Sequence, residues 1–144
     1  MIIDLMRETK NYFVVGKEDG TFVISGGAIT LQGQYLAGQY IAVSGSILND
    51  GVYKLTNSQG AAAGLADETF TGIVYALAVP KDFERLSTDI DSFLEQNPEG
   101  AAVSESFGGY SKTRQTGEKG VVTWQERFAK RINPFRKMFT EVSL

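Results

Sequence analysis

Short runs of alternating apolar and polar residues fill the first half of the chain. Phe22 and Ile24 fall on one face of such a run, and Tyr53 and Leu55 fall on one face of another. A period of two residues is typical of a β-strand with one buried face. The pattern predicts a helix over residues 2–11 and strands over residues 12–15, 21–25, 28–32, 40–44, 52–56 and 70–79.

Turn-forming residues separate the predicted strands. Asp19-Gly20 predicts the tip of a hairpin between the first two strands, and Gly26-Gly27 predicts the next turn. Asn49-Asp50-Gly51 indicates a further turn, because these residue types tolerate a positive φ. Residues 57–68, NSQGAAAGLADE, are small and flexible, which predicts a surface loop. The nearly continuous apolar run over residues 70–79 predicts a strand buried on both faces.

The hydrophobic period becomes helical after Pro80, a residue that fits the first turn of a helix. The apolar face carries Phe83, Leu86, Ile90, Phe93 and Leu94, and the other face is strongly acidic. Asn97-Pro98 ends this helix. We expect the acidic amphipathic helix to pack on the sheet.

A second helix is predicted near the C-terminus, where Thr123-Trp124-Gln125-Glu126 forms a capping box. Pro134 removes one internal hydrogen bond, which predicts that the helix is kinked or split near Asn133. We expect residues 124–132 to pack on the chain's own body and residues 135–139 to face a partner. One apolar stripe contains Trp124, Phe128, Ile132, Phe135 and Phe139, and basic residues cover the remainder of the helix.

These elements predict an α+β fold: a small antiparallel barrel-like β-sheet with an acidic amphipathic helix, a long arm and a basic C-terminal helix. The arm contains five glycines and little hydrophobic periodicity. A stretch of this length without regular structure usually has a function or a partner. We expect a single domain, with a β-rich body over residues 1–98, the arm over residues 99–120 and the helix over residues 121–144.

Composition excludes several classes of chemistry. The chain has no histidine and no cysteine, so it cannot form a Ser-His-Asp triad, a His-bearing zinc site or a disulfide. Carboxylates such as Asp89 and Asp91 point to different sides of their helix, and the glycine loops match no phosphate-binding motif. We therefore expect no enzyme and no catalytic, cofactor or metal site. No apolar run is long enough to span a bilayer, and we expect a soluble intracellular protein.

The net charge of −3 hides an asymmetry along the chain. Residues 1–110 carry 6 basic and 14 acidic side chains, whereas residues 111–144 carry 8 basic and 3 acidic ones. Acidic body and basic tail could stack head-to-tail, or the tail could be a solvated face. The basic aromatic helix could bind nucleic acid, an anionic membrane or a protein. We favour protein docking, because Trp, Phe and Arg are enriched at interfaces and the acidic body would repel DNA.

Four segments, taken in chain order, carry a family resemblance. They are GQYIAVSGSILNDGVYKL (38–55), DETFTGIVYALAVP (67–80), SESFGGYSKTRQTG (104–117) and WQERFAKRINPFRKMF (124–139), about half of the chain. Together they resemble a family of small tailed-phage and prophage proteins of Gram-positive hosts, encoded among the head–tail joining genes. The Ser-Glu-Ser-x-Gly-x-Tyr-Ser element is similar to one in the wider group of phage head–tail connector (adaptor) proteins. Many adaptors are mostly helical, which leaves adaptor, stopper and other neck positions open for this strand-rich chain.

The resemblance implies a structural protein of the virion neck that joins capsid and portal to the tail as a homo-oligomeric ring. It implies as partners the chain itself, the portal and other neck or tail proteins, with DNA at most passing through the lumen and no membrane. It implies a location in the virion, and in the host cytoplasm during assembly. The alternative is a nucleic-acid-binding module that uses the basic C-terminal tail. The expected interaction residues are Phe107, Gly108, Gly109, Tyr110 and Ser111 in the arm and Trp124, Arg127, Phe128, Lys130, Arg131, Phe135, Arg136 and Lys137 in the docking helix.

Overall fold

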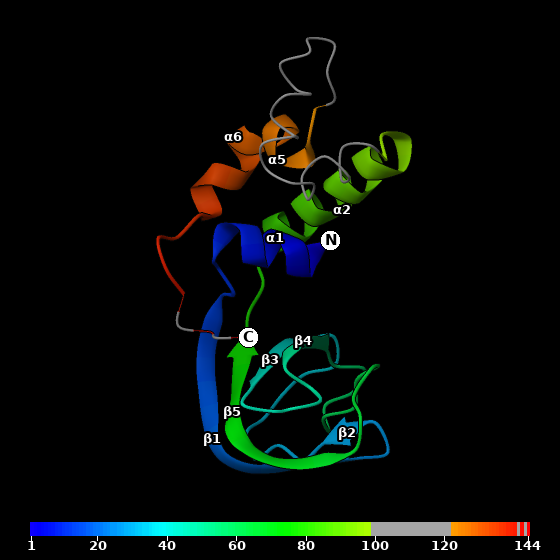
Figure 1. Cartoon of the computed structure of the whole chain (residues 1–144), viewed down its shortest axis with the longest axis vertical. Coiled ribbons are helices and arrows are strands. Elements are labelled where there is room, and N and C mark those ends of the chain that lie inside the picture. The colour runs from blue at the N-terminus through cyan, green and yellow to red at the C-terminus, as the bar shows by residue number, and fades with distance from the viewer. Residues whose placement is uncertain (99–121, 141, 143) are drawn as a thin grey trace. The chain divides into compact units, whose positions relative to one another are not determined.

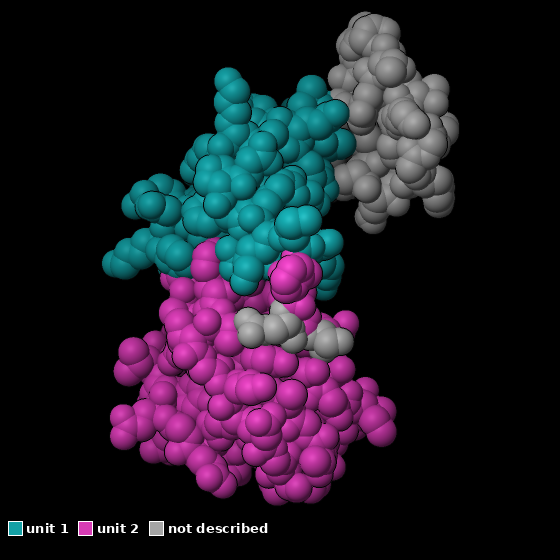
Figure 2. Space-filling view, turned by 90° about the vertical axis from the view of Figure 1, so that its left-hand side faces the viewer, with its two compact units in different colours: residues 1–11, 80–138 teal, residues 12–79, 139–144 magenta. Residues whose placement is uncertain are grey.

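The computed structural model describes residues 1–98, 122–140, 142 and 144. The chain divides into two compact units, shown in different colours in Figure 2. The helical unit contains Met1–Asn11 and Pro80–Met138, and the sheet unit contains Tyr12–Val79 and Phe139–Leu144. The helical unit therefore combines the first residues of the chain with segments that follow the strands, a grouping that the sequence pattern did not predict.

The sheet unit is built on five antiparallel strands in the order β2-β1-β5-β3-β4. The sheet curls into a half-barrel, with β1 and β5 paired along almost their whole length (Figure 1). This arrangement confirms the prediction of a small α+β fold with a barrel-like antiparallel sheet. The strands are β1 (Val14–Ser25), β2 (Ala28–Ile29), β3 (Tyr40–Ser44), β4 (Gly51–Lys54) and β5 (Glu68–Leu77).

The turn predicted at Gly26-Gly27 is present. Ser25 pairs with Ala28 across it, so the loop between β1 and β2 has two residues. The φ angle is +63° at Gly26 and +79° at Gly27. Positive φ at both central residues is the geometry of a type I′ turn, which glycine adopts without strain.

The hairpin predicted at Asp19-Gly20 is wrong. β1 runs straight through both residues, which pair with Ile73 and Gly72 of β5. The local preference of Asp-Gly for a turn is weaker than the ladder of pairs that β5 provides along the whole strand. Gly72 also allows a close backbone approach, because a Cβ placed there would lie 2.2 Å from the carbonyl oxygen of Ser44.

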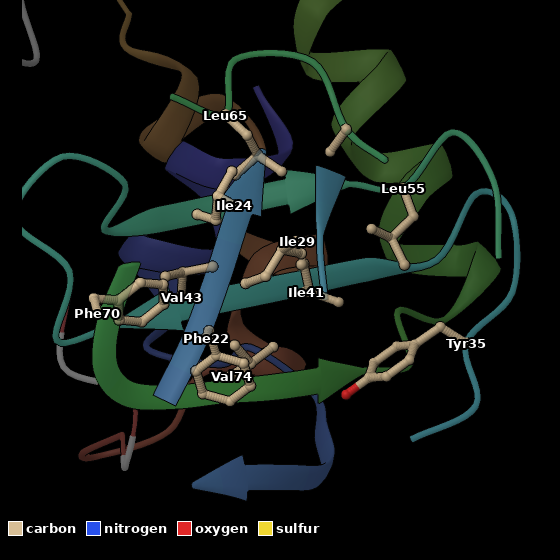
Figure 3. Packing of buried hydrophobic residues seen from close by; sticks show 11 residues of the cluster. Phe22, Ile24, Ile29, Tyr35, Ile41, Val43, Leu55, Leu65, Phe70 and Val74 are labelled. Carbon is tan, nitrogen blue, oxygen red and sulfur yellow. The ribbon is translucent and has the colours of Figure 1, made fainter. Parts of the chain in front are cut away.

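The core of the sheet unit gathers side chains from several strands, which converge between the ribbons in Figure 3. The rings of Phe22 and Phe70 pack with centroids 5.5 Å apart. β5 was predicted to be buried on both faces, but only Val74 and Tyr75 are consecutive buried residues, and Thr69 and Thr71 are exposed. The buried cluster comprises Phe22, Ile24, Ile29, Tyr35, Ile41, Val43, Leu55, Ala62, Leu65, Phe70 and Val74.

Residues 57–68 contribute to this core, whereas the sequence predicted a surface loop. Ala62 and Leu65 are buried members of the cluster. A Cβ placed on Gly60 would lie 2.0 Å from the carbonyl oxygen of Ile29. The small residues of this segment therefore allow close packing against β2, a role that composition alone does not distinguish from flexibility.

The helical unit contains the two helices predicted on either side of the strands, α1 (Ile2–Thr9) and α2 (Lys81–Gln96). α2 follows Pro80 and buries Phe83, Leu86 and Ile90, as its period predicted. Within its own unit α2 contacts α1 and α5, and its side chains also meet Arg131 of the C-terminal segment and the ring of Phe135. The expected packing of α2 on the sheet stays a prediction.

The predicted C-terminal helix is divided into three pieces: α5 (Trp124–Arg127), α6 (Ala129–Ile132) and the 3-10 helix η1 (Asn133–Phe135). The capping box is present, because Thr123 Oγ1 accepts from the Glu126 amide at 3.3 Å and Glu126 Oε1 accepts from the Thr123 amide at 3.2 Å. The change near Asn133 appears as a switch to 3-10 geometry, with Pro134 in the first turn of η1. The break at Phe128 was not predicted.

Candidate interaction surface

The predicted interaction residues fall into two groups. Those of the arm, Phe107 to Ser111, lie outside the described residues. Those of the C-terminal segment, Trp124 to Lys137, belong to the helical unit.

The aromatic residues of the C-terminal segment face the interior of their unit. Trp124 and Phe128 are buried, and the ring of Phe128 lies edge-on to Phe93 of α2 with centroids 5.7 Å apart. The ring of Phe135 lies edge-on to Phe83 at 5.0 Å. We expected Phe135 to face a partner, but its ring instead packs against α2.

The basic residues divide into paired and exposed groups. Arg131 Nη2 lies 2.8 Å from Asp89 Oδ2, and Arg136 Nη1 lies 2.9 Å from Glu8 Oε2. Exposed ion pairs contribute little to stability, so their main effect is to direct these two guanidinium groups toward the chain's own acids. Within the C-terminal segment, the exposed cations for which the described residues provide no ion pair are Arg127, Lys130 and Lys137.

An exposed apolar pair follows this anchored segment. The Lys137 amide donates to the Thr9 carbonyl at 2.8 Å, and Lys10 Nζ donates to the Met138 carbonyl at 3.4 Å. Immediately beyond these bonds, Met138, the last residue of the helical unit, is 88% exposed, and Phe139, which belongs to the sheet unit, is 79% exposed.

A second exposed apolar pair lies in the loop between β3 and β4. Ile47 is 91% exposed and Leu48 is 63% exposed, although both belong to residue types that are usually buried. We call these two residues the tip pair. Sequence reasoning missed them, because the turn signal at Asn49-Asp50-Gly51 explained the segment without reference to its apolar residues.

The carboxylate of Glu68, at the start of β5, accepts hydrogen bonds from several groups of this loop. Its Oε1 accepts hydrogen bonds from Ser46 Oγ and from Asn49 Nδ2, the latter at 2.8 Å. Its Oε2 accepts from the Ile47 amide at 3.1 Å. The hydrogen bond from Ser46, with those from Asn49 and from the backbone of the tip pair, holds the pKa of the Glu68 carboxyl below its ordinary value.

Further hydrogen bonds fix the backbone on each side of the tip pair. Asn49 is fully buried, and its side chain accepts from the Ala66 amide at 2.8 Å and donates to the Ala66 carbonyl at 3.0 Å. Asp50 Oδ1 accepts from the Ser46 amide at 2.7 Å, and the Tyr53 hydroxyl donates to the Asn49 carbonyl at 2.8 Å. The tip pair therefore stands on a preorganised backbone, which lowers the entropic cost of binding.

Comparison with known proteins gives no relative from which a role for the tip pair could be taken. The sequence matches no family model, no curated protein and no solved structure. Across the described part of the chain, no cluster of three Asp or Glu side chains is placed to hold a metal ion. None of the described helices is long and apolar enough to cross a bilayer. The geometry offers an exposed apolar pair, Ile47 and Leu48, that can bury surface against another protein.

Proposed function

We propose that this chain is a structural virion protein of a tailed phage or prophage, which joins the capsid and portal to the tail as part of a homo-oligomeric neck ring. The sequence resemblance of its four segments motivates the proposal. One structural observation supports it most directly: the tip pair is exposed on a loop whose backbone is held by a network of side-chain hydrogen bonds from Glu68 and Asn49.

A protein that works alone gains nothing from this arrangement. Leaving Ile47 and Leu48 in water forgoes about 1.5–3 kcal/mol for each side chain that burial would recover. Their positions are set by Glu68 and Asn49, so they do not collapse onto the surface of their own unit. An exposed and preorganised apolar tip is expected where a partner supplies the missing contact.

The free energy gained by burying the tip pair is too small for tight binding in solution but large enough for a subunit that assembles on a template. Two buried aliphatic side chains provide about 3–6 kcal/mol, whereas association costs about 4–15 kcal/mol in lost freedom. A single contact through the tip therefore binds weakly in solution. On a portal ring that holds neighbours close together, a high effective concentration makes the same contact sufficient.

Deletion of the gene from the phage or prophage that encodes this chain tests the proposal. We expect heads and tails to accumulate unjoined, and the wild-type chain supplied in trans to restore tailed particles that contain it. Ile47→Asn combined with Leu48→Asn should fail to restore them while keeping the wild-type melting temperature. Leu36→Asn, at a residue 73% exposed elsewhere in the sheet unit, is the matched control and should restore them. Normal tailed particles from the deletion strain would refute the neck role.

A further inference from the structure

One edge of β1 is only partly covered by a neighbouring strand. β5 pairs with β1 along almost its whole length, whereas β2 pairs with the other edge of β1 only at Ile24 and Ser25. Just beyond this hairpin, the Thr30 amide donates to the Val23 carbonyl at 2.9 Å. Among the described residues, the segment after Thr30 makes no further backbone–backbone hydrogen bond to β1. This edge of β1 therefore stays open on the N-terminal side of Val23.

Backbone groups at this open edge lack partners. Alternate residues of a strand direct their N–H and C=O groups to the same side, so those of Asp19 and Thr21 share the direction of the Val23 carbonyl. The described residues provide no hydrogen bond to these groups of Asp19 and Thr21. A row of unpaired strand donors and acceptors is a template to which an extended chain can add as a further strand.

An acidic groove of about 440 Å³ lies along the same edge. It is lined by residues 18–23 of β1 and, from the segment after β2, by Gln32 and Gly33 among others. The charged residues of its lining are Glu18 and Asp19, and no described Lys or Arg forms an ion pair with either. The edge therefore favours an extended chain that carries positive charge.

The sequence of the arm contains a run with this pattern. The arm lies outside the described residues, but its sequence includes YSKTRQT, residues 110–116, between two glycines. A run that contains Tyr and Thr and is bounded by glycines is typical of a strand. In an extended chain, a period of two places Lys112 and Arg114 on one face, and the run has no acidic residue. A fully extended chain spans about 3.3–3.6 Å per residue, so an arm of this length can reach a neighbouring copy.

We propose that residues 110–116 of one copy add as a strand to the open edge of β1 in a second copy. Main-chain hydrogen bonds to Asp19 and Thr21 supply the affinity, and Lys112 and Arg114 beside the acidic groove supply the specificity. The inference rests on the proposed ring and specifies a contact that builds it. A copy that receives a strand still offers its own arm, so the contact repeats from subunit to subunit and forms a ring when the rotation closes.

Two other occupants of the open edge are outcomes of the test. The same edge of a second copy would give a two-fold symmetric dimer, but it would bring Glu18 and Asp19 of both copies together, and facing like charges are destabilising. Residues 110–116 of the same chain would fill the groove without joining two copies.

Disulfide trapping separates these occupants, because the chain has no cysteine of its own. Thr21→Cys protein is mixed with Thr113→Cys protein that carries a mass tag, and mixed dimers are counted during mild oxidation. Thr113 is central in the run, so it can lie opposite Thr21 in either strand direction. The control replaces the first partner with Thr56→Cys, at an exposed threonine outside the groove. We expect the 21–113 disulfide to form at least about ten times faster than the 56–113 disulfide, a difference of about 1.4 kcal/mol in activation free energy.

The charges provide a second readout. Asp19→Thr removes a groove carboxylate and introduces a residue that suits a strand, and Lys112→Gln with Arg114→Gln removes the opposing charges. Either change alone should slow the 21–113 disulfide several-fold. Both together should slow it less than the product of the two effects, because paired charges couple in a double-mutant cycle. Glu95→Gln, which removes one acidic charge from α2, is the control and should leave the rate unchanged. A rate that is the same in Asp19→Thr and Glu95→Gln proteins would overturn the choice of the basic run as the occupant.

The outcomes also distinguish this contact from the neck role. A 21–113 rate equal to that of the control overturns the contact, as does faster 21–21 trapping. A chain that carries both Thr21→Cys and Thr113→Cys, closes within itself and yields no dimers overturns it as well. The neck role then still depends on the deletion strain alone. Conversely, fast 21–113 trapping together with normal particles from the deletion strain would retain the contact and refute the neck role.

Discussion

The hydroxyl of Tyr35 donates a 2.5 Å hydrogen bond to Oε2 of Glu18. The same carboxylate accepts from the amides of Gln32 and Gly33, each at 3.0 Å. One side chain of β1 thus holds the segment that leads from β2 toward β3. Burial would raise the pKa of Glu18, but the hydrogen bonds from Tyr35, Gln32 and Gly33 outweigh it and lower that pKa.

Glu18→Gln should lower the free energy of unfolding by about 1–3 kcal/mol, because hydrogen bonds to a charged acceptor are lost and an amide group faces a backbone donor. Tyr35→Phe should cost less, about 1 kcal/mol, because it removes one of the three bonds. Urea unfolding measures both. Glu95→Gln on the exposed face of α2 is the control and should be neutral. A Glu18→Gln protein as stable as this control would contradict the assigned role.

Stability should depend on pH through both Glu18 and Glu68, whose pKa values are lowered from an ordinary 4.5. A carboxyl with a lowered pKa stabilises the fold fully above its ordinary pKa and loses that contribution as pH falls through the lowered one. We therefore expect urea midpoints to be constant from pH 7 to about 5 and to fall below pH 4.5. The fall should be smaller in Glu18→Gln and Glu68→Gln proteins. An equal acid dependence in all three proteins would show that neither carboxylate is responsible.

Local sequence signals predicted the helices, one turn and one helix cap, but they did not predict which segments pair or pack with one another. The helices at both sides of the sheet, the Gly26-Gly27 turn and the capping box at Thr123 each depend on residues close together in sequence. The hairpin prediction at Asp19-Gly20 failed because pairing with β5 lies about fifty residues away along the chain. No local pattern indicates that Glu18 binds Tyr35.

The tip pair illustrates the same limit at the candidate site. Its turn residues were visible in the sequence, but its rigidity depends on Glu68 and Ala66, which lie beyond β4. Exposure of Ile47 and Leu48 could not be predicted, because aliphatic residues are buried by default. One signal could have indicated this surface: Ile47 and Leu48 are two adjacent aliphatic residues inside a turn, and they do not belong to the alternating pattern of either neighbouring strand.

Gly72→Ala should destabilise the sheet by about 1–3 kcal/mol, because its Cβ would lie 2.2 Å from a backbone oxygen that cannot move cheaply. Gly16→Ala is the matched control on the neighbouring strand. A Cβ there would meet only the Ala76 Cβ, at 4.0 Å, so the change should be neutral or slightly stabilising. Thermal unfolding of both proteins tests the close approach of β3 and β5, and equal melting temperatures would count against it.

Phe135 and Phe139 should respond in opposite ways to truncation. Phe135→Ala removes a half-buried ring that packs on Phe83, and we expect a cost of roughly half the 3–5 kcal/mol of a fully buried aromatic residue. Phe139→Ala should change the free energy of unfolding by no more than about 0.5 kcal/mol, because its ring is exposed. An exposed ring can be buried against a neighbouring copy, so the change should nevertheless impair assembly. A Phe139→Ala protein that assembles normally would exclude this residue from the assembly contacts.

If the basic segment binds nucleic acid, the chain should bind duplex DNA tightly and in a salt-sensitive way. We expect no such binding. The ion pairs of Arg131 with Asp89 and of Arg136 with Glu8 occupy two of the five cations in the C-terminal segment, and the whole chain is acidic. We expect a Kd no tighter than the non-specific range of about 10⁻⁴–10⁻⁶ M at physiological salt. Asp89→Asn releases Arg131 and should steepen the slope of log K against log salt by about 0.9 only if this segment binds phosphate. A nanomolar Kd for the wild-type chain, together with that steeper slope, would replace protein docking with nucleic-acid binding as the role of the basic segment.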